Sequence, residues 1–374
     1  MLRPAAACLT LLLFASTALA DAPATSDTVP PTDAAAEAAY HEASVEYERQ
    51  MRTLREKMTP LFLKLRQSID PRDWVLASQM YMLSQDNDDP AFSAAARAEL
   101  LRNAAAAAPE DNLVQWIAMN AMPRSEGGCA APQALPANLD TVLRLEADNG
   151  LAWLPVLRQA YQDKDALGID SALSRMAAAT RYDDHAVEYA QLQADLYRNN
   201  PDNTWLPENA GGWSKEDVWL QFALTQAGSI SPSLHVLREI CDREKQPEAD
   251  PRRFAICADL GSQLLRHAKH TSVRGEGAAL LAQVATSTPE VVAFEREQAW
   301  LLTAFSSGDI QQNVRRFHEA LLRTGDEQEA LREVARAQSL AIAPPPLWQA
   351  PEWDEESDLP TAAPDTDAGD PTDE

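Results

Sequence analysis

The chain has 374 residues, of which 57 are acidic and 32 basic, and its formal net charge is −25. This composition argues against binding to nucleic acid or to anionic lipid surfaces, because both require clustered Lys and Arg. Alanine is abundant and only 13 residues are glycine, which favours helices over sheets. We therefore expect an all-α protein that has no nucleic acid among its partners.

The first twenty residues have the pattern of a secretory signal peptide. Arg3 supplies the positive charge, Leu9 to Ala15 form a short apolar run, and Ala18-Leu19-Ala20 is a small-x-small cleavage site. The apolar run is too short to span a bilayer. We predict cleavage before Asp21, no membrane insertion after cleavage, and a periplasmic location of the Gram-negative type, with secretion as the alternative. An uncleaved N-terminal anchor is the competing interpretation.

After cleavage roughly 350 residues remain, more than one compact core usually holds. The composition changes several times along them, and each change marks a predicted boundary. The predicted segments are a disordered leader (21–33), an N-terminal helical half (34–199), a Trp-containing loop (200–214), a C-terminal helical half (215–343) and a disordered acidic, Pro-rich tail (344–374).

The N-terminal half begins with a predicted long helix over Ala34–Lys57, whose alternating charges indicate a solvated face. Asp70-Pro71 then opens a second helix, with Asp as the cap and Pro in the first turn, where proline is tolerated. An alanine-rich partner helix follows from Pro90. This pair is interpreted as the first full helix hairpin.

A short motif, Asp-Asn followed four residues later by Trp, then recurs at an interval of 37 residues. Asp111-Asn112 precedes Trp116 as Asp148-Asn149 precedes Trp153. Over Leu145–Asp184 the Asp-Asn pair can cap a helix, and a break at residues 163–165 leads into a second apolar-periodic helix. Neither helix could bury its apolar stripe alone, so we expect neighbouring hairpins to stack on this one.

These residues resemble tetratricopeptide repeats and their Sel1-like relatives. Pro109-x-Asp111 and Pro201-x-Asn203 resemble the turn between repeats, and Trp153 to Tyr161 resembles the first repeat helix. Over Asp70–Arg336 the resemblance implies a right-handed α-solenoid of stacked helix hairpins. It also implies a non-enzymatic protein that binds a protein or peptide partner of the cell envelope in its concave face.

If such a groove exists, four side chains are candidates to line it: Trp116, Trp153, Arg158 and Tyr161. The competing interpretation is that the Trp residues belong to the core of each repeat.

The span Asn199 to Lys215 interrupts the helical pattern with two Pro, two Gly and two Trp. Long loops of this kind are often functional. Trp205 and Trp213 could form an aromatic platform for a sugar or peptide, which supports the alternative hypothesis of a carbohydrate-active or hydrolytic envelope protein. The other interpretation is that both rings fill a gap between the two halves.

In the C-terminal half, prolines near helix starts and Gly-Asp pairs near helix ends define the expected elements. The expected helices are Lys215–Ala227, Ser231–Lys245, Pro251–Lys269, Val273–Thr286, Pro289–Ser306, Gln311–Arg323 and Asp326–Ala341.

Three cysteines remain after signal removal, and an exported protein reaches an oxidising compartment. Cys241 ends one predicted helix and Cys257 lies in the first turns of the next, so an antiparallel hairpin would place them at similar heights. We predict a Cys241–Cys257 disulfide and a free Cys129. Three reduced thiols are the alternative.

No motif of a known chemistry occurs in the chain. Gly275-Glu276-Gly277 lacks the third glycine of a dinucleotide motif and is interpreted as a turn. Asp183-Asp184-His185 precedes a helix, so we interpret Asp as the cap and His as its solvated neighbour. His267 and His270 lie in a basic helix terminus, which favours capping over metal binding. We predict no catalytic residue, no metal and no cofactor.

Pro344-Pro345-Pro346 ends the regular structure, and Trp348 and Trp353 follow it inside the polar tail. Two Trp residues are unusual in such a segment. They either pack back on the last helix or serve as a short docking peptide for a partner.

Overall fold

The computed structural model describes residues 58–80, 92–120, 136–200, 215–284 and 288–349, together with a few positions between 45 and 56. Within these ranges every regular element is a helix, and the β contacts are isolated bridges. The all-α prediction is therefore confirmed for this part of the chain. None of the helices described here is both long and apolar enough to cross a membrane.

In the first half, residues 58–66 are helical and several short helices follow them. Their bounds are α3 (Pro71–Gln79), α4 (Ala94–Ala107), α5 (Asn112–Asn120), α6 (Leu139–Leu145), the 3₁₀ helix η4 (Gly150–Trp153), α7 (Leu154–Gln162), α8 (Ala166–Ala177) and α9 (Ala186–Arg198).

The second half continues the same construction, with one further 3₁₀ turn. Its elements are α10 (Lys215–Ala227), η5 (Gly228–Ile230), α11 (His235–Ile240), α12 (Pro251–His267), α13 (Thr271–Val284), α14 (Pro289–Phe305), α15 (Ile310–Thr324) and α16 (Glu327–Ala337).

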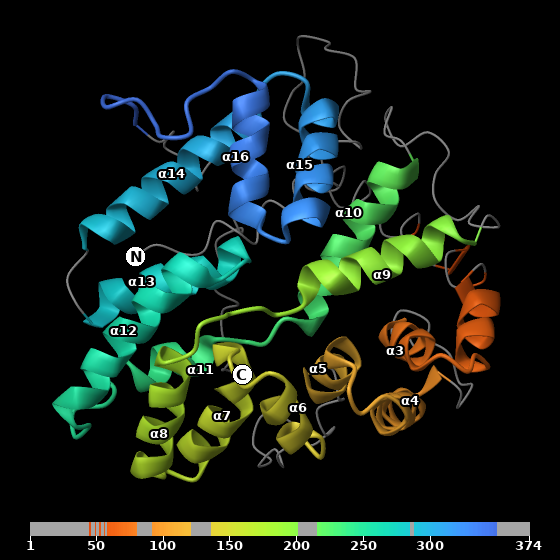
Figure 1. Cartoon of the computed structure of the whole chain (residues 1–374), viewed down its shortest axis with the longest axis horizontal. Helices are drawn as coiled ribbons and strands as arrows, with labels where there is room; N and C mark the ends of the chain where they lie inside the picture. The colour runs from red at the N-terminus through yellow and green to blue at the C-terminus, as the bar shows by residue number, and fades with distance from the viewer. Residues whose placement is uncertain are drawn as a thin grey trace, which may run out of the picture.

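Neighbouring helices pack in pairs, and the pairs follow one another around the molecule (Figure 1). Helices α3 to α8 run along the lower side of this view, α12 and α13 lie on the left, and α14 to α16 lie along the top. Helices α9 and α10 pack together, and both contact α15. The segment between α8 and α9 crosses the middle of the molecule.

Local capping signals account for most helix starts. Asp70 accepts a hydrogen bond from the Arg72 N–H at the start of α3, and the Ser93 side chain accepts one from the Ala96 N–H at the start of α4. Pro155 falls in the first turn of α7, because the 3₁₀ turn η4 separates this helix from its predicted start. The proline therefore removes no interior hydrogen bond.

Two local predictions were wrong. Helix α11 is shorter than the predicted Ser231–Lys245, because the Asp242 side chain accepts the N–H groups of Glu244 and Lys245 and forms a turn there. Gly275 and Gly277 do not form a turn but lie inside α13.

The predicted disulfide is confirmed. Cys241 and Cys257 are bonded with their Cα atoms 5.9 Å apart, and both are fully buried. Closing a loop of this size reduces the entropy of the unfolded chain and stabilises the fold by about 3 kcal/mol. Cys129 lies outside the described residues.

The largest buried core extends from Met58 to Leu280 and so includes residues on both sides of the predicted boundary at 200–214. A second core joins α14, α15 and α16. The largest core therefore spans the predicted boundary, and Tyr182 of the segment between α8 and α9 belongs to it.

Candidate functional site

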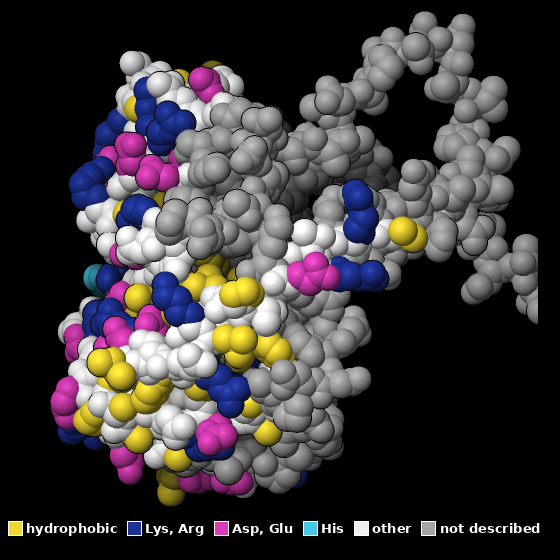
Figure 2. All heavy atoms as spheres, turned by 90° about the vertical axis from the view of Figure 1, so that its right-hand side faces the viewer, with side chains coloured by type: hydrophobic (Ala, Val, Ile, Leu, Met, Phe, Trp, Pro, Cys, Tyr) yellow, Lys and Arg dark blue, Asp and Glu magenta, His cyan; other side chains and the backbone are white. Residues whose placement is uncertain are grey.

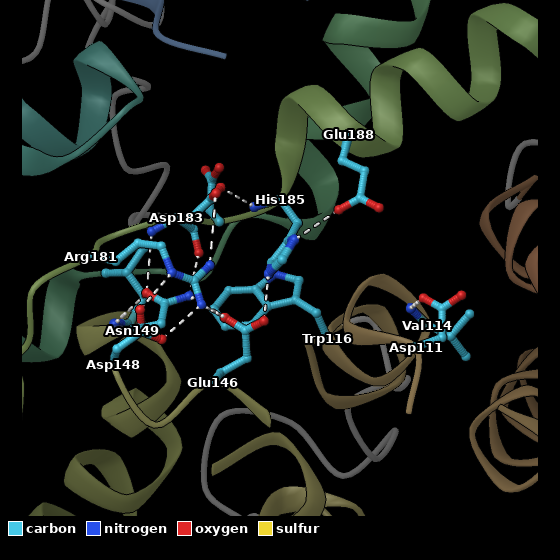
Figure 3. Close-up of polar contacts among 12 residues, drawn as sticks. Asp111, Val114, Trp116, Glu146, Asp148, Asn149, Arg181, Asp183, His185 and Glu188 are labelled. Carbon is cyan, nitrogen blue, oxygen red and sulfur yellow. Dashed lines mark hydrogen bonds and ion pairs between the residues drawn. The ribbon is translucent and has the colours of Figure 1, made fainter. Parts of the chain in front are cut away.

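We call residues 181–185, which lie between α8 and α9, the central segment. Arg181 pairs in parallel with Asn149 of the α6–η4 connection, and Tyr182 pairs with Ala268 of the α12–α13 connection. The central segment thus contacts elements that lie far apart in the sequence. Its polar side chains form the cluster shown in Figure 3.

Glu146 is the buried anion of this cluster, with its side chain 1% exposed. Its Oε2 accepts hydrogen bonds from Arg181 Nη2 at 2.6 Å and Asn149 Nδ2 at 3.0 Å. Its Oε1 lies 3.2 Å from His185 Nε2, an ion pair without the alignment of a hydrogen bond. Burial alone would raise the pKa of Glu146, but these neighbours lower it to about 2. Glu146 is therefore ionised at neutral pH.

His185 is a buried cation held between two carboxylates. Its side chain is 6% exposed, and its Nδ1 lies 3.2 Å from Glu188 Oε2, opposite the contact with Glu146. Burial alone would lower the pKa of His185, but the two carboxylates raise it to about 9. The Trp116 ring lies 5.2 Å away between centroids, and an aromatic face also favours a cation.

The backbone of His185 is in the left-handed region, with φ 59° and ψ 12°. This conformation costs a residue other than glycine roughly 1 kcal/mol or more. Side chains of the two preceding residues hold it in place: Asp183 Oδ1 accepts the His185 N–H at 3.0 Å, and Asp184 Oδ1 accepts the Ala186 N–H at 3.1 Å. The central segment thus begins α9 with the imidazole turned toward Glu146 (Figure 3).

On one side the cluster borders an open hollow of about 570 Å³. Arg72 of α3 reaches across it, with Nε 2.7 Å from Asp111 Oδ2 and Nη2 3.4 Å from Glu188 Oε1. Glu188 therefore links the surface of the hollow to His185. The residues that line it come from α3, the α4–α5 connection, the first residue of α5, the end of the central segment and α9: Arg72, Ala108, Pro109, Glu110, Asp111, Asn112, His185 and Glu188.

On the other side the central segment is tied to the second half of the chain. Lys269 Nζ lies 2.5 Å from Asp183 Oδ2, and the Ser231 hydroxyl donates to Asp184 Oδ2 at 2.6 Å. Burial alone would raise the pKa of Asp183, but Lys269 and His185 lower it. The cluster therefore joins the α3–α9 region to the α10–α13 region through ion pairs.

The arrangement holds His185 as a cation at neutral pH. An imidazole acts as a general base through its neutral form, whereas His185 has a pKa of about 9 and a carboxylate at each ring nitrogen. None of the residues that line the hollow is Ser, Thr, Cys or Lys. Across the described residues, no group of three or more His, Cys, Asp or Glu is placed to hold a metal ion.

Of the side chains that the sequence suggested for a groove, Trp116 contacts this cluster through the His185 ring. Trp116 is fully buried, so its ring supports His185 from the interior and does not face the hollow. Its indole N–H has no hydrogen-bond partner among the described residues.

The other candidates lie on η4 and α7. Trp153 is half-buried, with the Arg175 guanidinium 5.6 Å from its ring centroid. Arg158 donates to the Ser233 carbonyl at 3.2 Å, and Tyr161 is half-buried against the main core. Trp205 and Trp213 lie outside the described residues, so the prediction of a site on their loop stays a prediction.

Sequence patterns pointed to two segments of the cluster, residues 148–149 and 183–185, but not to the ion pairs and hydrogen bonds that their side chains form. Asn149 does cap η4, yet its amide also donates to Glu146 and to the Asp183 carbonyl. The prediction of a solvated His185 was wrong, because carboxylates compensate its charge in the interior. Glu146 and Arg181 lie 35 residues apart, and no pattern in the sequence around either residue indicates that the two side chains pair.

The raised pKa of His185 predicts a pH-dependent stability. Since the folded pKa is about 9 and the ordinary value is 6.5, the stabilisation is complete below about pH 6.5 and is lost as the pH rises through 9. We call this loss the alkaline limb of the stability profile; it amounts to about 3 kcal/mol of the free energy of unfolding. The lowered pKa of Glu146 adds an acidic limb, because the stabilisation by the ionised Glu146 is lost as the pH falls from 4.5 toward 2. Urea unfolding at a series of pH values measures both limbs.

The control is His185→Asn, since asparagine tolerates the left-handed backbone but does not titrate. We expect the alkaline limb to flatten in this variant. An alkaline limb of equal size in wild type and variant would contradict the assignment to His185.

Comparisons of this chain with models of protein families, with curated proteins and with solved structures found no match.

Proposed function

We propose that this chain is a non-enzymatic helical-repeat protein of the periplasm that binds a segment of a partner protein in the hollow between α3, the α4–α5 connection and α9. The observation that carries this proposal is the lining of the hollow. Carboxylates, a guanidinium and a buried imidazolium meet there, already paired with one another, and no Ser, Thr, Cys or Lys is among the lining residues.

The architecture supports this proposal. Helices packed in successive pairs present fixed surfaces at little conformational cost, as in an α-solenoid. The turn at Pro109 to Asp111, which resembles the turn between tetratricopeptide repeats, itself lines the hollow. The disulfide and the N-terminal signal pattern fit an exported protein.

The charges at the rim favour a basic partner segment. Glu110 has a side chain that is 70% exposed and Glu188 one that is 45% exposed, and each already contacts an arginine. An incoming Lys or Arg can take the place of these arginines, and the net charge of −25 would speed its approach. On the face shown in Figure 2, basic and acidic side chains are intermixed.

The test is site-specific photocrosslinking in the native host, with the crosslinking residue in place of Asn112, which lines the hollow. The expected result is one dominant envelope protein, captured through a basic segment. Glu110→Lys in the same chain should reduce the yield several-fold and weaken the salt dependence of binding, because Glu110 contributes to electrostatic steering.

The matched control is Glu244→Lys, a charge reversal of equal size at another exposed position. It should leave the yield unchanged. Two outcomes would show that the hollow is not the binding site. The two charge reversals could reduce the yield equally, or the crosslinker could capture many proteins in proportion to their abundance.

A further inference from the structure

Beyond α16 the chain folds back onto α14. Residues 345–348 form a turn in which the Trp348 N–H donates to the Pro345 carbonyl at 2.9 Å. Pro346 occupies the second position of this turn, where proline is favoured. The Trp348 ring then packs edge-on against Trp300, with 5.3 Å between ring centroids and 77° between planes.

Two side chains of α14, one helical turn apart, receive this segment. Arg296 Nη2 carries two N–H groups and lies within hydrogen-bond distance of three backbone carbonyl oxygens, those of Pro345 at 2.5 Å, Pro346 at 2.8 Å and Trp348 at 3.1 Å. The Trp300 indole N–H donates to the Ala341 carbonyl at 2.7 Å. We call Arg296 and Trp300 the α14 acceptor site.

The α14 acceptor site contacts mainly backbone. Pro345, Pro346 and Leu347 are exposed, and Leu347 is 95% exposed. The contacts therefore require a turn that presents its carbonyls to one guanidinium, followed by an aromatic ring that can meet Trp300. Proline-rich segments are recognised in other proteins by aromatic-lined surfaces, and here an aromatic ring and a guanidinium contact a proline-rich turn.

We propose that the α14 acceptor site is a docking site for a Pro-Pro-x-aromatic turn, occupied here by the chain's own residues 345–348, which the equivalent turn of a partner protein can displace. The exposed prolines make the internal occupant weakly buried and hence exchangeable. A second copy of this chain would offer the same turn and no new contact, while association carries an entropic cost. A partner with further contacts around the turn gains affinity that the internal segment lacks.

The internal turn acts as a tethered competitor. A short tether gives it an effective concentration of about 1 mM. If the turn binds with a dissociation constant near 100 μM, the internal copy weakens binding of an external turn by about tenfold, the ratio of these two concentrations. Weakening the internal turn should therefore expose the acceptor site without altering it.

The experiment uses the full chain and a fluorescent peptide with the sequence of residues 341–349, and measures anisotropy. Trp348→Ala should bind the peptide about tenfold more tightly than wild type. Adding Arg296→Ala or Trp300→Ala to Trp348→Ala should abolish binding. A Trp348→Ala chain with Arg102→Ala, an exposed arginine on α4, should bind as Trp348→Ala alone does. Far-UV circular dichroism of every variant verifies that it is folded.

Three outcomes would overturn the proposal. Trp348→Ala could bind the peptide no more tightly than wild type, or binding could persist in folded variants that lack Arg296 or Trp300. Light scattering could instead show that the wild type exchanges its turn between two copies, as a dimer that Trp348→Ala dissociates. Each result is independent of the hollow between α3 and α9, so the two proposals fail separately.

Discussion

Replacing Glu146 with alanine is expected to lower the free energy of unfolding by about 3 kcal/mol, the lower end of the range for breaking a buried ion pair. The substitution removes the anion that faces Arg181 at 2.6 Å and His185 at 3.2 Å. Arg181 keeps Asp148 and His185 keeps Glu188. These remaining pairs explain why we expect the lower end of the range.

Glu146→Gln should cost less than half as much as Glu146→Ala. Its amide oxygen can still accept from Arg181, and its NH₂ group can donate to a neutral His185 Nε2. The pKa of His185 should therefore fall in this variant. Urea unfolding gives the stabilities, and NMR titration of the imidazole gives the pKa.

The control for Glu146 is Glu110→Ala, which breaks the exposed ion pair with Arg144. Exposed pairs contribute little to stability, so no measurable change is expected. If Glu146→Ala were as harmless as Glu110→Ala, the buried cluster would not hold the central segment in place.

The contrast between these two glutamates explains what the sequence could predict. Helix starts at Pro71, Pro251 and Pro289 depend on residues within one turn, and local patterns identified them. The disulfide was predictable because Cys241 and Cys257 flank one hairpin loop and lie only 16 residues apart. Such features need no knowledge of how distant segments meet.

The polar cluster around Glu146 and His185 could not be predicted in this way, because its members come from segments that are distant in the sequence. Arg72 and Glu188 lie 116 residues apart, and each looks like a solvated charge on a helix when taken alone. His185 next to two Asp residues fits an ordinary helix cap equally well. What distinguishes Glu146 from Glu110 is burial, which depends on the passage of the central segment between α6 and the α12–α13 connection. No periodicity within one helix encodes that passage.

The second large effect is expected at the crossing of α12 and α13, where Gly261 and Gly277 let the two backbones touch. A Cβ atom at position 277 would lie 2.6 Å from both the Gly261 carbonyl oxygen and the Leu265 nitrogen. Neither backbone atom can move aside as a flexible side chain could. Gly277→Ala should therefore force the helices apart and lower the free energy of unfolding by about 3 kcal/mol, the upper end of the usual overpacking range.

Gly275→Ala is the matched control, because it makes the same substitution in the same helix. A Cβ at position 275 meets nothing within 4 Å, so alanine should raise the free energy of unfolding by up to about 1 kcal/mol through its better helix propensity. Displacement of α12 from α13 would also move Lys269, which lies in the connection between them and holds Asp183. Because this cation would then no longer compensate the charge of Asp183, which favours protonated His185, we expect Gly277→Ala, and not Gly275→Ala, to raise the pKa of His185, measured by NMR titration. Equal stabilities for the two variants would show that the crossing tolerates a wider separation.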